Sequence, residues 1–138
     1  QNFNDAAQQV RCNAALGALD AGAPQRARAA IAAGFEVLKL KVGLQRVEQE
    51  LALLRQLAAG LPRRIALRLD ANRAWNMADA QRFIADMAGL PLEMLEEPLA
   101  QPDITALATL QGLTEVPLAL DESLPELGLA QVLADLGL

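Results

Sequence analysis

The stretch LRLDANRAW, Leu67–Trp75, begins as an apolar run typical of a buried strand and ends in a cluster of polar side chains. A turn after a strand would account for Asp70 and Asn72 on their own, because Asp and Asn are common in turns. The same change recurs along the chain, about once per βα unit. A polar residue lies near the end of each of five strand-like runs: Asn13, Lys41, Asp70, Glu96 and Asp121. This recurrence indicates the fold.

The segments between these residues alternate between strand-like and helix-like patterns. Strands are predicted over 10–16, 35–42, 65–69, from 94 onward and over 118–120, and helices over 24–33, 44–58, 76–87, 103–110 and from 125 onward. Strict alternation predicts a parallel sheet with helical crossovers, either doubly wound or closed as a barrel. The absence of a GxGxxG or GxxxxGK[ST] loop favours the barrel. A complete (β/α)₈ barrel takes about 250 residues, so we expect an α/β fold that is a partial TIM-type barrel of about five βα units.

Individual residues mark the expected helix ends. Pro24 suits a first helical turn, and Gly34 lies where a C-terminal cap belongs. Asn76, with Asp79 three residues later, resembles a capping box, and Asp103 is typical of an N-cap.

Composition excludes several classes of function. The 138 residues are 53% hydrophobic, enough for one domain with a core. A net charge of −5 with scattered basic residues argues against nucleic-acid and anionic membrane surfaces. Without histidine, Ser-His-Asp chemistry and histidine-bound zinc are excluded, and proton transfer must use Lys, Asp or Glu. The single cysteine, Cys12, cannot form an internal disulfide, and no signal peptide or spanning segment is evident, so a cytoplasmic protein is expected.

We interpret residues 1–9 as a tail or linker remnant and residues 10–138 as one barrel-type domain. The chain begins with Gln1 and stops inside an apolar run, so we expect it to be a fragment. A half-barrel leaves its first and fifth strands without outer neighbours, which predicts self-association or coverage by further chain.

Three carboxylates follow neighbouring strands of the predicted sheet: Asp70, Glu96 and Asp121. The carboxyl ends of parallel strands share one rim, so these groups are expected to lie together. Like charges at that spacing repel unless a cation lies between them. Oxygen ligands without histidine or cysteine predict a hard ion, Mg²⁺ or, as a substitute, Mn²⁺. Each acid alone is better explained as a helix cap, but three in register favour a metal site.

Lys39 and Lys41 are the only lysines in the chain, because the other ten basic residues are arginines. Residues two apart on a strand point to the same side, so these lysines face together, as do Arg68 and Asp70. Burial or a neighbouring cation can lower a lysine pKa enough for the amine to act as a base near neutrality. The alternative is an exposed pair on an edge strand.

Four motifs, in order, resemble the enolase superfamily in its muconate-cycloisomerase-like branch. They are KLKVG (39–43), LRLDANRAW (67–75), LEEPL (95–99) and LALDESL (118–124). Each motif alone is weak, but four in family order over most of the chain are specific. Within the superfamily, the Arg68 variant and the EEP sequence most resemble the o-succinylbenzoate synthases, which act in menaquinone biosynthesis.

The resemblance implies roles for nine residues, and the strand-end position of Asn13 places it with them. Lys41 would be the catalytic base and Lys39 its electrostatic partner, while Asp70, Glu96 and Asp121 would bind Mg²⁺. A further set would contact the substrate or support the site: Arg68, Asn72, Asn13, Glu122 and Ser123. Lys41 would remove a proton next to a carboxylate of a small-molecule substrate, and the resulting enediolate charge would be stabilised by the metal.

The resemblance leaves the reaction open. Dehydration, as in o-succinylbenzoate synthase, is the leading expectation, and a racemase, epimerase or cycloisomerase is the alternative. A non-catalytic α/β binding module is the alternative from another class. The chain lacks the later strands with the family's second lysine, since no lysine follows Lys41, and lacks the capping domain. We therefore expect the chain as given to have no useful turnover.

Overall fold

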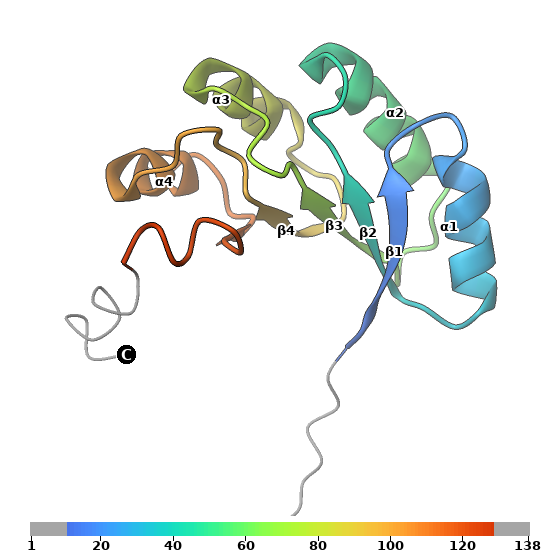
Figure 1. Ribbon diagram of the computed structural model, residues 1–138. Coiled ribbons are helices and arrows are strands. Elements are labelled where there is room, and N and C mark those ends of the chain that lie inside the picture. Colours follow the sequence, from blue (N-terminus) through green and yellow to red (C-terminus); the bar gives the residue numbers. More distant parts are fainter. Residues whose placement is uncertain (1–10, 129–138) are drawn as a thin grey trace, which may run out of the picture.

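The structure, a computed structural model, describes residues 11–128 (Figure 1). Strands and helices alternate strictly along this range. In chain order the elements are β1 (Asn13–Ala18), α1 (Ala23–Ala32), β2 (Val37–Lys41), α2 (Val47–Ala59), β3 (Ala66–Asp70), α3 (Met77–Asp86), β4 (Leu92–Glu96), α4 (Ile104–Gln111) and β5 (Leu118–Ala119). No helix in this range is long and apolar enough to cross a lipid bilayer.

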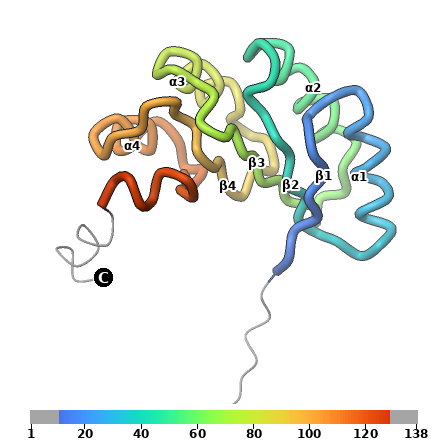
Figure 2. The backbone as a smooth tube through the Cα atoms, viewed as in Figure 1, coloured from blue at the N-terminus to red at the C-terminus, as the bar shows by residue number. Residues whose placement is uncertain are grey.

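The five strands form one parallel sheet in the order β1-β2-β3-β4-β5. A doubly wound sheet reverses its order at a switch point, which places helices on both faces. Here the order never reverses, and the right-handed crossovers put every helix on the same side. Figure 1 and Figure 2 show the four helices as an arc along one side of the curved sheet. The predicted α/β fold with barrel-type winding is confirmed.

Alternating side chains on the central strands divide into two faces. Leu38 and Leu40 of β2 and Leu67 and Leu69 of β3 are buried in the core under the helices. The residues between them are mostly polar and belong to the other face, because neighbouring strand residues point to opposite sides. Trp75 packs in the core and is 4% exposed. Its ring centroid lies 4.4 Å from that of Phe83 on α3.

The predicted caps are present. The Asn76 side chain accepts a hydrogen bond from the Asp79 N–H at 2.8 Å, and the Asp103 side chain accepts one from the Ala106 N–H at 2.8 Å. Gly34 follows α1 with φ of +97°, a conformation that L side chains rarely adopt. Its N–H donates to the Ile31 carbonyl at 3.0 Å, which closes the last turn.

Several predicted boundaries are wrong. β1 begins at Asn13 rather than at residue 10, because Asn13 pairs with Val37, the first residue of β2. β2 and β3 cover 37–41 and 66–70 rather than 35–42 and 65–69. β4 begins at Leu92 rather than at 94, since the Glu93 carboxylate that interrupts the apolar run is paired with Arg68.

Only part of what was predicted for the two ends of the chain falls within the described residues. Residues 122–128 form turns rather than the start of a regular helix. The remainder of the predicted fifth helix and the predicted tail over 1–9 lie outside the described residues.

Candidate active site

The candidate site lies on the face of the sheet away from the helices, at the carboxyl ends of the strands. Lys41 is in register with Asp70, and Asp70 with Glu96. One step back, Lys39 is in register with Arg68. Strand alternation puts all of these side chains on one face, so both lysines share a face with Asp70 and Glu96.

Lys39 bridges the two carboxylates of this row. Its Nζ lies 3.0 Å from Asp70 Oδ2 and 2.6 Å from Glu96 Oε2. The side chains are 26%, 8% and 14% exposed for Lys39, Asp70 and Glu96, so the contact is only partly accessible to water. Burial alone would lower the pKa of Lys39, but the hydrogen bonds to Glu96 and Asp70 outweigh it, and the pKa is raised above that of an ordinary lysine. The Lys39 amine is therefore held as a cation.

Asp121 lies apart from this contact. Glu96 is in register with Ala119, so Asp121 is two residues beyond the row, in the turn after β5. Among residues 11–128 no group of three His, Cys, Asp or Glu side chains is arranged to hold a metal ion. The structure thus brings together two of the three predicted ligands, and the three-carboxylate assignment stays a prediction.

The donor chemistry of the pair nevertheless suits a divalent cation. Asp70 and Glu96 offer only carboxylate oxygens, the ligands that hard ions such as Mg²⁺ prefer. Both carboxylates already converge on one positive charge, the Lys39 ammonium. The chemistry of the two groups therefore fits a site for a hard cation.

Arg68 and Asn13, both predicted near the substrate, contact each other. Arg68 Nη1 donates to Asn13 Oδ1 at 3.2 Å, and Arg68 Nε donates to Glu93 Oε2 at 2.7 Å. Sequence reasoning missed Glu93, although an acid near the start of a strand that is otherwise apolar up to Glu96 is a visible signal. Arg68 is thus fixed across three strands, between β1 and β4.

The remaining predicted residues lie in the turns beyond the strands. Asn72 Nδ2 donates to Glu122 Oε1 at 3.0 Å, which links the turn after β3 to the turn after β5. The Asn72 N–H donates to Asp70 Oδ1 at 3.0 Å. Ser123 is fully buried and donates to Glu97, a residue that the sequence analysis did not assign to the site. Three non-glycine residues of these turns have positive φ: Asn72, Arg73 and Glu97.

Glu50 is a further residue that sequence reasoning missed. This fully buried carboxylate on α2 accepts backbone hydrogen bonds from Gly43 at 2.7 Å, Leu44 at 3.0 Å and Gln45 at 3.3 Å. It holds the turn that follows the lysine strand. Its sequence signal is an acid on the stripe of Val47, Leu51 and Leu54, where only apolar residues are expected.

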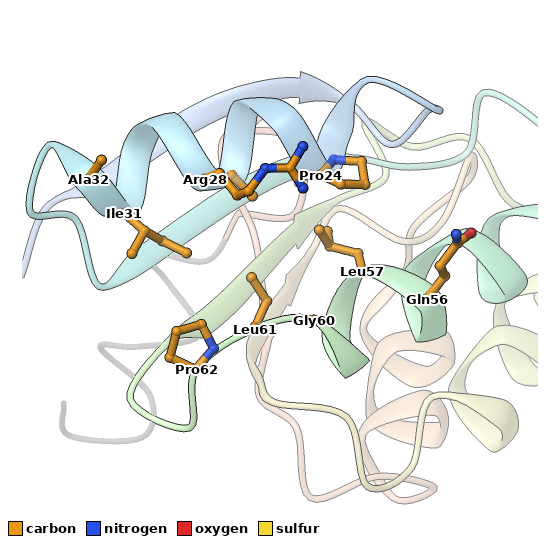
Figure 3. A pocket seen from close by; sticks show the side chains of 10 residues that line it. Pro24, Arg28, Ile31, Ala32, Gln56, Leu57, Gly60, Leu61 and Pro62 are labelled. Carbon is orange, nitrogen blue, oxygen red and sulfur yellow. The ribbon is translucent and has the colours of Figure 1, made fainter.

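A cavity lies away from the candidate site, between two helices. It has a volume of about 490 Å³ and opens between α1 and the carboxyl end of α2, and Figure 3 shows Ile31, Leu57 and Leu61 among the side chains around it. Its lining is largely apolar and contains no acidic residue. It does not provide the carboxylates or lysines that the proposed chemistry requires.

The comparisons with known proteins agree on one family. Residues 23–138 match the family described as Enolase C-terminal domain-like. The chain is 34% identical over 92 residues to the L-Ala-D/L-Glu epimerase of Bacillus subtilis (strain 168), and 41% identical over 93 residues to the o-succinylbenzoate synthase of Thermosynechococcus vestitus. Each alignment covers 65% of this chain but only 25% and 29% of the respective relative. The chain therefore spans a minor part of these relatives' length.

The fold agrees with a solved structure of the same kind. The crystal structure of o-succinylbenzoate synthase from Thermosynechococcus elongatus BP-1, complexed with Mg in the active site, superposes with a TM-score of 0.78 at 32% identity. The match covers 94% of this chain and 41% of that one.

Proposed function

The chain belongs to the Enolase C-terminal domain-like family of the enolase superfamily, and from that premise we propose that it carries the base and the cation-binding carboxylates of a lyase or isomerase. The reaction would begin with removal of a proton next to a carboxylate of a small-molecule substrate. The observation that carries the proposal is the Lys39 ammonium held between Asp70 and Glu96, with Lys41 on the same strand face.

The roles of the residues follow from their positions. Lys41, at the carboxyl end of β2, would take the proton. Lys39, which is held between Asp70 and Glu96, would be its electrostatic partner on the same face of the sheet. Asp70, Glu96 and Asp121 would hold Mg²⁺ or Mn²⁺, and a bound ion would supply stabilisation for negative charge developing on the substrate.

Two reactions of this class have specific support. Dehydration by an o-succinylbenzoate synthase is favoured by the 41% identity to one such enzyme and by the structural match to another. Epimerisation at the α-carbon of a dipeptide is the second candidate, supported by the 34% identity to an L-Ala-D/L-Glu epimerase. Both would use the same first step. We further propose that the protein is cytoplasmic, acts in menaquinone biosynthesis and binds a small carboxylate ligand.

Metal titration separates the enzyme proposal from a non-catalytic α/β module. Mn²⁺ binding to the chain would be measured by the loss of the free Mn²⁺ spin-resonance signal, for Asp70→Ala, Glu96→Ala and Asp121→Ala. Removal of an oxygen ligand is expected to weaken binding in all three variants. Glu93→Ala, an acid on the same strand as Glu96 that is paired with Arg68, serves as the control. Binding unchanged in all three variants would support the module.

A further inference from the structure

Glu97 is an acidic residue whose place in the fold calls for an explanation. It follows the candidate ligand Glu96 directly, yet it is fully buried and its φ is +47°. A non-glycine residue in this region costs about 1–2 kcal/mol. A charged, buried and strained side chain persists only where the surrounding contacts compensate for these costs.

The contacts of Glu97 join three turns at the carboxyl ends of the strands. Its Oε1 accepts hydrogen bonds from the N–H groups of Asp121 at 2.6 Å and Ser123 at 2.9 Å, and its Oε2 accepts one from the Ser123 hydroxyl. Its backbone N–H donates to the Ala119 carbonyl at 3.0 Å, and its carbonyl accepts from the Arg73 N–H at 2.8 Å. One residue thus connects the turns after β3, β4 and β5.

These contacts act most directly on Asp121. The Asp121 N–H is bonded to Glu97, and so are the N–H and hydroxyl of Ser123, two residues later. The backbone of Asp121 is therefore restrained on both sides by one carboxylate. Hydrogen bonds to an ionised acceptor are about twice as strong as neutral ones. Both Glu97 oxygens are engaged in this way, so the carboxylate is committed to the turn rather than to a cation.

We propose that Glu97 is a positioning residue, whose buried carboxylate fixes the turn after β5 so that Asp121 can join Asp70 and Glu96 at a divalent cation. The inference rests on the proposed function, since it requires Asp121 to be a metal ligand. It assigns the two adjacent acids of the EEP sequence different tasks. Glu96 faces the cation, and Glu97 holds the backbone that carries another ligand.

The test is a double-mutant cycle on Mn²⁺ affinity, measured on the full 138-residue chain with Mn²⁺ alone as the probe. Glu97→Gln keeps the side-chain volume but removes the charge and turns an NH₂ group toward backbone donors. It is expected to weaken Mn²⁺ binding by about 10–100-fold, the usual effect of losing a group that orients a ligand. In an Asp121→Asn background the same change is expected to have no further effect, because the ligand that Glu97 positions is already altered.

The controls separate positioning from general destabilisation. Glu126→Gln alters the same turn by removing an exposed ion pair with Arg73, and it is expected to leave Mn²⁺ affinity unchanged. Urea unfolding followed by Trp75 fluorescence reports whether each variant is folded under the binding conditions. If Glu97→Gln does not fold, Ser123→Ala removes one hydrogen bond to the carboxylate, and a several-fold weaker affinity is expected.

The possible failures are distinct. Wild-type affinity in Asp121→Asn would contradict the proposed ligand set, and with it the proposed function. Weak binding in Asp121→Asn together with wild-type binding in folded Glu97→Gln or Ser123→Ala would overturn only the positioning role. An equal loss from Glu97→Gln in both backgrounds would also overturn it, because Glu97 would then act independently of Asp121.

Discussion

Lys39 occupies the position where two carboxylates of neighbouring strands converge. Bringing Asp70 and Glu96 together without a positive charge would be unfavourable, because like charges in a partly buried site repel strongly. The ammonium group removes that repulsion and satisfies both acids. The same residue therefore stabilises the sheet and maintains the arrangement of acids that a divalent cation would use.

Replacing Lys39 by methionine should expose this dual role. Without divalent cations, Lys39→Met is expected to lose about 3 kcal/mol of unfolding free energy, because two partly buried carboxylates are left facing each other. Mg²⁺ should restore part of the loss by taking the place of the ammonium group. Urea unfolding with and without Mg²⁺ measures both effects. Lys41→Met is the matched control, since Lys41 makes no ion pair within residues 11–128, and equal losses in the two variants would contradict the prediction.

Asp20 should make stability depend on pH at the acid end. Its pKa lies below the ordinary value of 3.8, chiefly because of the hydrogen bond from Arg26 and then that from the Gly22 N–H. A carboxyl whose pKa is lower in the folded than in the unfolded state stabilises the fold above the unfolded value, and the contribution is lost as the pH falls through the folded value. Asp20→Asn should therefore be less stable than wild type near neutrality, and the gap should close as the pH falls below 3.8. Thermal unfolding across this range tests the prediction, and a constant gap would refute it.

At the scale of elements, the turn between β2 and α2 decides where the lysine strand ends. Glu50 accepts three backbone N–H groups from this turn, and Gly43 passes close to the turn after β3. A Cβ on Gly43 would lie 2.4 Å from the Ala74 Cβ and 3.2 Å from the Ala71 carbonyl oxygen, and φ is +81°. The absence of a side chain at Gly43 lets two adjacent turns pack together beside the candidate site.

Gly43→Ala should accordingly be destabilising, by about 2–4 kcal/mol from the combined conformational and steric costs. Gly34→Ala offers a matched comparison, because Gly34 also has positive φ but nothing lies within 4 Å of the place that a Cβ would take. That variant should lose only about 1–2 kcal/mol. The difference between the two unfolding free energies measures the close contact with Ala74, and equal losses would show that the contact contributes nothing.

At the scale of the whole molecule, the sheet has two edge strands, β1 and β5. Within residues 11–128, β1 pairs only with β2, and β5 only with β4. Unpaired N–H and carbonyl groups along an edge strand favour pairing with another chain. The chain on its own is therefore expected to associate as its concentration rises, with sedimentation velocity as the measurement. A monomer at every concentration would contradict this expectation.

Much of this architecture could be predicted from the sequence because two periodicities carried the information. The alternation of strand and helix patterns indicated the parallel sheet, and the two-residue spacing of Lys39 and Lys41 indicated their common face. The interval between polar strand ends also placed Asp70 and Glu96 on neighbouring strands, where they are in register. These features depend on local repeats, which are visible in one dimension.

The remaining features depend on contacts between distant segments. The bond from Ser123 to Glu97 and the approach of Gly43 to Ala74 have no periodic signal. Whether Asp121 reaches the acidic pair depends on the conformation of a turn, and strand spacing does not specify a turn. Glu50 and Glu93 were missed although each had a local signal, an acid within an otherwise apolar stripe or run.

The uninterrupted order of the sheet also bears on how the chain is made. Within residues 11–128, every strand pairs only with its neighbours in the sequence, so each described strand can join the sheet when the next βα unit has been synthesised. Chains generally fold from the N-terminal part onward as they emerge from the ribosome. The sheet can therefore grow vectorially, each nascent βα unit docking on the one already formed.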